Sequence, residues 1–174
     1  MVIWLIGLSG AGKTTVGEEV VRLWRRTTPN CVLVDGDAMR HIFGSDSATS
    51  DYSMTARRIN AERITEVCAW LDRQDINVVC CILSLFPDMR DSNRSRFGRY
   101  FEVFIDAPLE LVEQRDPKGL YREARAGRKN CVVGIDIPFP VPQAADLVVD
   151  AALGVSANAV ALEILVRAGV LPHA

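Results

Sequence analysis

Positions 7–14 read GLSGAGKT, and this spacing of glycine, lysine and threonine suits phosphate binding. Glycines let successive backbone N–H groups converge on phosphates, while Lys13 reaches the β- and γ-phosphates. The Thr14 hydroxyl can bind Mg²⁺, and a following helix would point its positive N-terminus at the anion. A purely structural glycine turn would need neither side chain. The pattern predicts a nucleoside triphosphate site with Mg²⁺ formed by Gly7, Leu8, Ser9, Gly10, Ala11, Gly12, Lys13, Thr14 and Thr15.

A second group of chemical residues follows the next apolar run, where Asp35 and Asp37 flank a glycine and Arg40 comes three residues later. In open parallel sheets, ligands bind beyond the carboxyl ends of the strands. Asp37 and Arg40 would share one face of a helix. A carboxylate there can take the proton from an attacking hydroxyl, and the guanidinium can hold an anionic substrate. Asp35 could reach Mg²⁺ through water. The alternative is that one of the two aspartates only caps a helix.

A third pattern lies in a long helical segment, where Arg57, Asn60 and Arg63 recur every third residue. Positions three apart drift slowly around a helix, so these side chains form one polar stripe. The apolar residues Ile59 and Trp70 share part of the same arc. This pattern fits a binding surface and a solvated charged face equally well.

The elements that position these residues follow from apolar runs that alternate with helical patterns. Strands are predicted at Val2–Ile6, Cys31–Asp35, Asn77–Leu83, Tyr100–Asp106 and Leu147–Asp150. Helices are predicted at Lys13–Arg26, Ala38–Phe43, Thr55–Gln74, Pro108–Gln114 and Ser156–Ala168. The alternation predicts an α/β fold, a three-layer α/β/α sandwich with a parallel five-stranded sheet, in one domain over residues 1–174. Residues 115–142, which are rich in glycine, proline and charge, are predicted to form a lid over the site.

Composition narrows the class of protein further. The chain has 174 residues, 49% of them apolar, which is enough for a core. A net charge of −2 argues against nucleic acid as the main partner. No apolar run is long enough to cross a membrane, so we expect a cytoplasmic protein without a membrane partner. The five cysteines lack C-x-x-C spacing and are expected to be buried, reduced thiols without zinc.

Beyond these patterns, the sequence resembles the adenylyl-sulfate kinase family of P-loop kinases. The phosphate-binding loop, D-G-D-x-x-R at 35–40 and R-x-x-N-x-x-R at 57–63 occur in that family in this order. The stretch FEVFIDAPLE at 101–110 does too. The most specific segments are RDPKGLY at 115–121, ARAG at 124–127 and GID at 134–136, which resemble the family's lid. The resemblance spans about residues 2–150 and implies a P-loop NTPase fold.

The resemblance implies ATP-dependent phosphorylation of the ribose 3′-hydroxyl of adenosine 5′-phosphosulfate, with Mg²⁺, in sulfate assimilation. It assigns catalytic roles to Lys13, Asp37 and Lys118. It assigns Arg115 and Arg125 to ATP, and Thr14 and Asp35 to the metal. It implies contacts of the nucleotide acceptor with Asp37, Arg40, Tyr52, Arg57, Asn60, Phe86, Lys118 and Val132. Tyr52 would stack on the base in place of the family's phenylalanine. Members of the family are commonly homodimers, so a homodimer is expected.

Three positions depart from the family pattern. Pro87 aligns with a serine that some members phosphorylate, Val132 aligns with the lid phenylalanine that completes the base sandwich, and Ala56 aligns with an aspartate. Loss of one aromatic face removes about 1–3 kcal/mol of base stacking, and a pyrimidine, which is smaller than a purine, would lose less of this energy. The alternative is therefore a kinase of the same family that acts on cytidine 5′-diphosphoramidate in capsule modification. A more remote alternative is a regulatory nucleotide switch, although the chain lacks the N-K-x-D of guanine-selective switches.

Overall fold

A parallel sheet forms the centre of the computed structural model, which describes residues 1–44 and 52–172. Its strands are β1 (Val2–Ile6), β2 (Cys31–Asp35), β3 (Asn77–Ile82), β4 (Tyr100–Asp106) and β5 (Leu147–Asp150). The order across the sheet is β2-β3-β1-β4-β5, and every neighbouring pair is parallel. The strands occupy the predicted segments, and β3 ends one residue earlier than expected. Because all five run the same way, their carboxyl ends meet along one edge.

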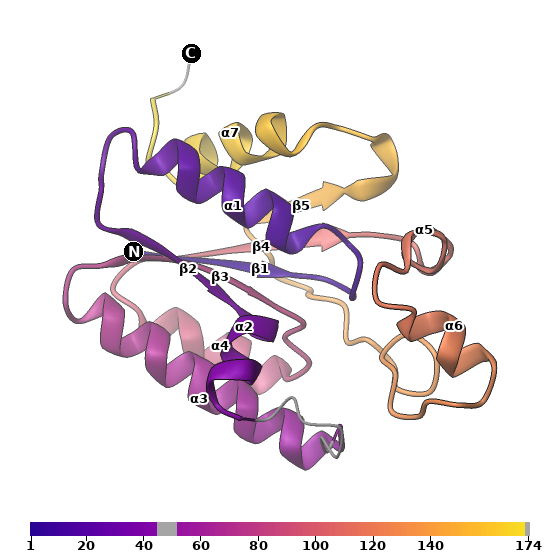
Figure 1. The fold of residues 1–174 in the computed structure, drawn as a ribbon. Coiled ribbons are helices and arrows are strands. Elements are labelled where there is room, and N and C mark those ends of the chain that lie inside the picture. The colour runs from indigo at the N-terminus through magenta and orange to yellow at the C-terminus, as the bar shows by residue number, and fades with distance from the viewer. Residues whose placement is uncertain (45–51, 173–174) are drawn as a thin grey trace.

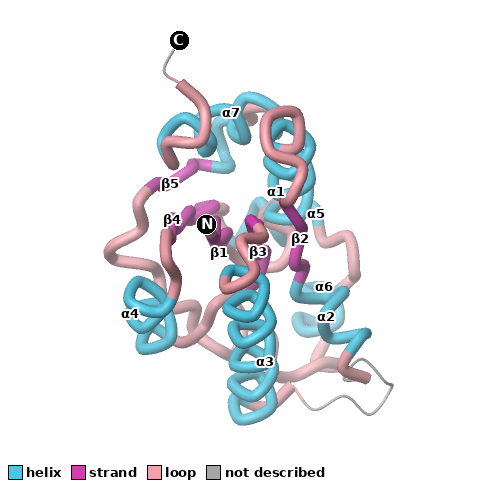
Figure 2. Tube along the Cα trace, turned by 90° about the vertical axis from the view of Figure 1, so that its left-hand side faces the viewer, coloured by secondary structure: helices cyan, strands magenta, loops and turns pink. Residues whose placement is uncertain are grey.

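Helices cover both faces of this sheet (Figures 1 and 2). On one face lie α1 (Lys13–Trp24) and α7 (Ala157–Arg167), which also pack against each other. On the other face lie α2 (Gly36–Ile42), α3 (Met54–Asp72) and α4 (Pro87–Arg96). The short helices α5 (Leu109–Arg115) and α6 (Leu120–Arg125) lie to one side, beyond the carboxyl edge, and a 3₁₀ turn at Ala151–Leu153 follows β5. The predicted three-layer α/β/α sandwich is confirmed.

The core consists of two apolar clusters separated by the sheet. Successive strand residues point to opposite faces, so Cys80 belongs to the cluster under α3 and Cys81 to the cluster under α1. Cys31, Cys68, Cys80 and Cys81 are buried free thiols, as expected, and Cys131 is partly exposed. Burial raises the pKa of Cys31 to about 11.

Close packing of α1 on β3 depends on Gly17. A Cβ at this position would lie 2.4 Å from Cys81 Sγ and 3.1 Å from Leu33 Cδ1. The absence of a side chain therefore lets the first helix lie directly on the sheet, which holds the loop before the helix at the edge where the strands end.

Two helices were not predicted. The first, α4, buries the polar residues Arg90 and Asn93 instead of an apolar stripe. Arg90 donates hydrogen bonds to the carbonyls of Ser84 (3.2 Å) and Pro140 (3.0 Å), so polar contacts hold the helix in place. The second, α6, is a six-residue turn within the predicted lid. In the described part of the chain, no helix combines the length and apolar character needed to cross a membrane.

Candidate active site

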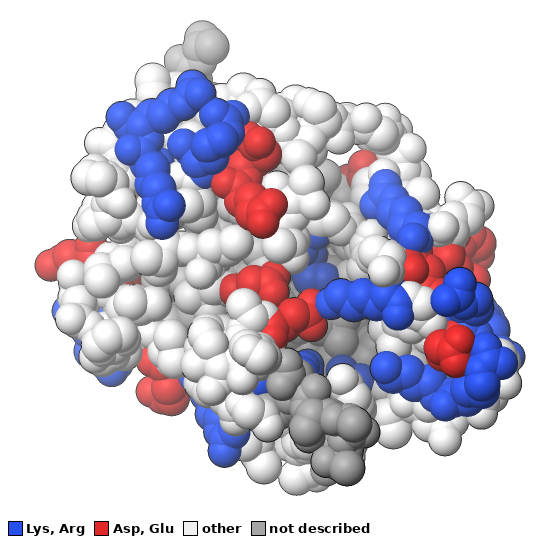
Figure 3. Space-filling model, viewed as in Figure 1, with Lys and Arg blue, Asp and Glu red and all other residues white. Residues whose placement is uncertain are grey.

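A cavity of about 860 Å³ opens at the carboxyl edge of the sheet. The phosphate-binding loop, the start of α2, the start of α3, residues 81–86, the lid and the chain after β5 line it. Figure 3 shows this hollow, with acidic side chains on one side and basic side chains of the lid on the other. Cavities of this size hold small-molecule ligands, and the lining comes from every segment that the sequence patterns indicated.

The phosphate-binding loop leads into α1 through Gly12, which takes the left-handed conformation at φ 100° that favours glycine. The Lys13 ammonium folds back over the loop and donates to the carbonyls of Gly7 (2.9 Å) and Leu8 (2.7 Å). Burial is the main cause that lowers the pKa of Lys13 to about 8. A bound polyphosphate would replace the two carbonyls with charged partners and favour the ammonium form.

Thr14 and Asp35, the two predicted metal ligands, touch each other. The Thr14 hydroxyl donates to Asp35 Oδ2 at 2.7 Å. The other oxygen, Oδ1, accepts the backbone N–H groups of Asp37 (2.9 Å) and Ala38 (3.2 Å) and caps α2. The capping alternative is therefore correct for Asp35, and the same carboxylate also faces the phosphate-binding loop. A hydroxyl and a carboxylate are oxygen donors of the kind that bind Mg²⁺ together with substrate phosphates.

Asp37 and Lys118 meet across the cavity. The Lys118 ammonium forms an ion pair with Asp37 Oδ2, which joins the lid to the first turn of α2. Both side chains are largely solvent-exposed, at 54% and 67% of their area. Asp37 therefore faces the open cavity, which the phosphate-binding loop also lines, and is accessible to a substrate.

A ring of cations surrounds Tyr52 in the part of the cavity away from the phosphate-binding loop. The guanidinium carbons of Arg40 and Arg57 lie 5.3 and 5.6 Å from the centre of the Tyr52 ring, and Lys129 Nζ lies 5.3 Å away. Arg57 also donates to the carbonyls of Tyr52 (2.9 Å) and Cys131 (2.6 Å). Burial, followed by the nearby Arg40, lowers the pKa of Arg57.

The polar stripe of α3 divides between the cavity and the surface. Asn60 lines the cavity, is buried, and its Oδ1 has no hydrogen-bond partner among the described residues. A buried amide oxygen without a partner is costly, so this atom suits a ligand that donates a hydrogen bond. Arg63 lies outside the cavity and stacks over Phe43 at 5.9 Å. The stripe thus lines the cavity at one end and faces solvent at the other.

Phe86, predicted to contact the acceptor, forms part of the cavity wall. The Arg58 guanidinium lies 4.2 Å from the centre of its ring, and two hydrogen bonds of 2.9 and 3.2 Å tie that guanidinium to Asp88. These contacts fix Phe86 in the cavity wall on the side of α4. Two residues before Phe86, the Ser84 hydroxyl accepts a hydrogen bond from Trp4 Nε1 at 3.3 Å.

Four predicted site residues do not line the cavity. Gly7 and Leu8 are buried at the start of the phosphate-binding loop, where their carbonyls accept hydrogen bonds from Lys13. The other two, Val132 and Arg125, lie elsewhere. Val132 is 1% exposed and belongs to the core, while its neighbours Cys131 and Val133 line the cavity. The reason is a tight turn in which the Asp136 carboxylate accepts the N–H groups of Cys131 and Val132 and turns the valine inward. Arg125 forms an ion pair with Glu113 of α5 at 2.8 Å and does not line the cavity.

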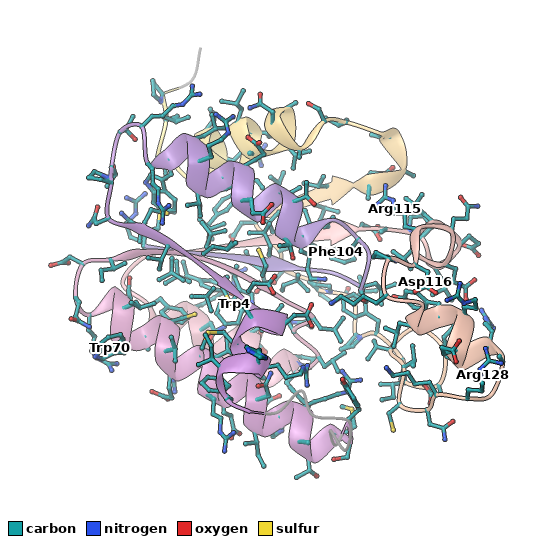
Figure 4. The ribbon with its side chains drawn as sticks, viewed as in Figure 1. Trp4, Trp70, Phe104, Arg115, Asp116 and Arg128 are labelled. Carbon is teal, nitrogen blue, oxygen red and sulfur yellow. The ribbon has the colours of Figure 1, made fainter. Side chains whose placement is uncertain are left out.

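Arg115, the other lid residue predicted to bind ATP, does line the cavity, and its guanidinium lies 3.4 Å from the carbonyls of Gly10 and Ala11 (Figure 4). The Tyr121 hydroxyl donates to the Ser9 carbonyl at 2.9 Å and ties α6 to the same loop.

The sequence patterns missed one wall. The end of β5, the segment after it and the start of α7 line the cavity with Val149, Asp150, Ala151, Gly154, Val155, Ala157 and Val160. These residue types carry little chemistry, so the only sequence signal for this wall was its position at the end of the last strand. In the structure, Asp150 caps a 3₁₀ turn by accepting the Ala152 N–H at 2.8 Å, and Gly154 has φ 66°.

Comparisons of the sequence and of the fold with known proteins agree on one family. A family model described as adenylylsulphate kinase matches residues 1–150. The adenylyl-sulfate kinase of Geotalea uraniireducens is 37% identical over 165 residues, which cover 93% of this chain and 78% of that protein. A probable adenylyl-sulfate kinase of Bacillus subtilis is 37% identical over 151 residues, which cover 86% of this chain and 75% of the relative.

Among solved structures, the Mycobacterium tuberculosis APS kinase in complex with AMPPNP and APS superposes with a TM-score of 0.84. It is 32% identical, and the match covers 95% of each chain. The phosphate-binding loop, the D-G-D turn and the lid converge on one cavity, and the match to the family model includes all three segments. The chain belongs to the adenylyl-sulfate kinase family.

Proposed function

We propose that this protein is an adenylyl-sulfate kinase, a phosphotransferase that moves the γ-phosphoryl group of ATP to the ribose 3′-hydroxyl of adenosine 5′-phosphosulfate. The observation that carries the proposal is the position of Asp37. It faces a single cavity between the phosphate-binding loop on one side and the cluster of Tyr52, Arg40 and Arg57 on the other. A kinase with a nucleotide acceptor needs two anion sites and a base between them.

The proposed chemistry assigns one task to each side chain. Asp37 accepts the proton of the 3′-hydroxyl, whose oxygen forms a bond to the γ-phosphorus while the bond from that phosphorus to the bridging oxygen of ADP breaks. Lys13 and Lys118 stabilise the negative charge on the transferred group. Lys118 must leave its ion pair with Asp37 to do so, which frees the carboxylate for the hydroxyl.

Mg²⁺, when bound, would neutralise part of the negative charge of the ATP phosphates. Thr14 and Asp35 are the residues that would hold it, directly or through water. Arg115 of the lid supplies a further positive group on the ATP side of the cavity. The lid as a whole is proposed to exclude water, which would otherwise compete for the phosphoryl group.

Acceptor identity is tested by incubating the protein with ATP and Mg²⁺ and one candidate acceptor at a time. ADP release with adenosine 5′-phosphosulfate, together with a 3′-phosphorylated product, is the expected result. ADP release with cytidine 5′-diphosphoramidate alone would select the capsule-modification alternative. ADP release that needs no acceptor would favour a nucleotide switch. Chelation of Mg²⁺ with EDTA should stop the reaction.

Three further properties belong to the proposal. A homodimer is expected from the family resemblance and is tested by sedimentation of the full chain. A cytoplasmic location is expected, since ATP and the nucleotide acceptor are both found there, and is tested by cell fractionation. One folding unit over residues 1–174, with residues 115–142 as its lid, is tested by a single cooperative unfolding transition.

A further inference from the structure

The cations around Tyr52 come from three separate elements. Arg40 belongs to α2, Arg57 to α3 and Lys129 to the lid, and all three line the cavity. The two arginines were predicted from sequence to hold an anionic acceptor. Lys129 was not predicted, and it is a positive charge that the lid contributes to this end of the cavity.

Lys129 turns inward between two exposed neighbours. Arg128 and Asn130 are exposed, whereas Lys129 is half-buried and its ammonium lies 5.3 Å from the Tyr52 ring centre. Arg128 forms a two-bond contact with Glu123 (2.6 and 2.9 Å) at the outer edge of the lid (Figure 4). Lys129 forms no ion pair with a carboxylate within residues 1–44 and 52–172. Its charge is thus directed at the cavity.

Three positive charges at one ring repel one another, and for one pair of them the repulsion adds to burial in lowering a pKa, since Arg40 lowers that of Arg57. The face of a tyrosine ring offsets only a small part of this cost. A ligand that carries two or more negative charges would satisfy all three cations at once. A nucleotide with a charged 5′ group fits, because its base can also stack on the ring.

We propose that Lys129 is a third ligand for the 5′ anionic group of the acceptor nucleotide, and that it selects acceptors whose 5′ group carries two negative charges. This inference rests on the proposed function, since it assumes a nucleotide acceptor at Tyr52. Because Lys129 belongs to the lid, the acceptor's own charge would draw the lid onto the cavity. The rival explanation is that Lys129 only packs on the Tyr52 ring.

The experiment compares Lys129→Met with Arg128→Met, which removes the neighbouring lid cation that faces away from the cavity. Equilibrium binding of adenosine 5′-phosphosulfate and of uncharged adenosine is measured for each variant, along with steady-state kinetics. Loss of one charge-assisted contact should weaken binding of the phosphosulfate about tenfold in Lys129→Met. Binding of adenosine and the KM for ATP should stay within about twofold. Arg128→Met should behave like the wild type, and Lys129→Arg should restore most of the affinity.

Equal weakening of phosphosulfate and adenosine in Lys129→Met would show a packing role and overturn the proposal, as would unchanged phosphosulfate binding. The same loss in Arg128→Met would also overturn it, because the effect would then be general to lid charge. Lys129→Gln replaces the methionine variant if that variant fails to fold. The proposed function fails separately: the wild type would then bind the phosphosulfate without transferring a phosphoryl group to it.

Discussion

Nucleotide binding should weaken as the pH rises, because Lys13 loses its proton in the ligand-free protein. Burial lowers the pKa of this ammonium to about 8, from 10.5. A triphosphate beside Lys13 favours the charged form, so the pKa of the bound lysine should return towards its ordinary value. Binding above pH 8 must then be accompanied by uptake of a proton, and a binding step that takes up protons is weakened by alkali.

The magnitude follows from the two pKa values. The protonated share of ligand-free Lys13 should fall from about three quarters at pH 7.5 to about one tenth at pH 9. If binding restores the ordinary pKa, the dissociation constant should rise about eightfold between these two conditions. The protein should take up about 0.9 protons per nucleotide at pH 9.

The assay is calorimetry of a non-hydrolysable ATP analogue with Mg²⁺, repeated at each pH in two buffers with different ionisation enthalpies. The difference between buffers gives the number of protons taken up. Lys13→Met should bind weakly at both pH values and show no uptake at pH 9. Cys131→Ser controls for the thiol that also lines the cavity. Wild-type binding without proton uptake at pH 9, or equal uptake in Lys13→Met, would refute the reasoning.

Four other predictions follow from single contacts. Asp37→Asn should lower kcat about 10²- to 10⁴-fold and leave the KM for ATP nearly unchanged, and steady-state kinetics would show the reverse if Asp37 is not the base. Lys13→Met should raise the free energy of unfolding by about 1–3 kcal/mol at pH 7, because the lowered pKa means that the buried ammonium destabilises the folded state below pH 8. Urea titrations should find that this gain decreases as the pH rises towards 10.5, where the lysine is neutral in the folded state. Val132→Phe should lower the free energy of unfolding by about 1–3 kcal/mol through overpacking, and tighter acceptor binding instead would restore its predicted place beside the base. Gly17→Ala should cost a similar amount, about 1–3 kcal/mol, and a Cys81→Ala background should relieve most of it in thermal unfolding.

The sheet and the side of the cavity formed by the phosphate-binding loop were predictable because their sequence signals are local. The inner strands β1 and β3 are short apolar runs buried on both faces, and such runs favour a parallel sheet between helices. The phosphate-binding loop needs glycines and Lys13 at fixed spacing, so its chemistry is legible without tertiary structure. The position of Asp37 at the cavity was predictable for the same reason, since it lies two residues after the end of β2.

The failures have a common physical origin in side-chain contacts that no pattern of residue types announces. The helix α4 is held by Arg90 on the carbonyl of Pro140, fifty residues away, and no apolar period announces it. Val132 turns into the core because of a local carboxylate turn, and Arg125 is captured by Glu113. The alignment with relatives gives the position of such a side chain in the chain but says nothing of its direction.

Asp35 divides its two oxygens between the first turn of α2 and the hydroxyl of Thr14. One side chain thus joins the phosphate-binding side of the cavity to the helix that carries Asp37 and Arg40. A rotation of this carboxylate towards an incoming cation would release the hydroxyl or the helix start, so we expect metal binding to change the position of Asp37, the proposed base. Substitutions at Asp35 will therefore report on both halves of the enzyme together.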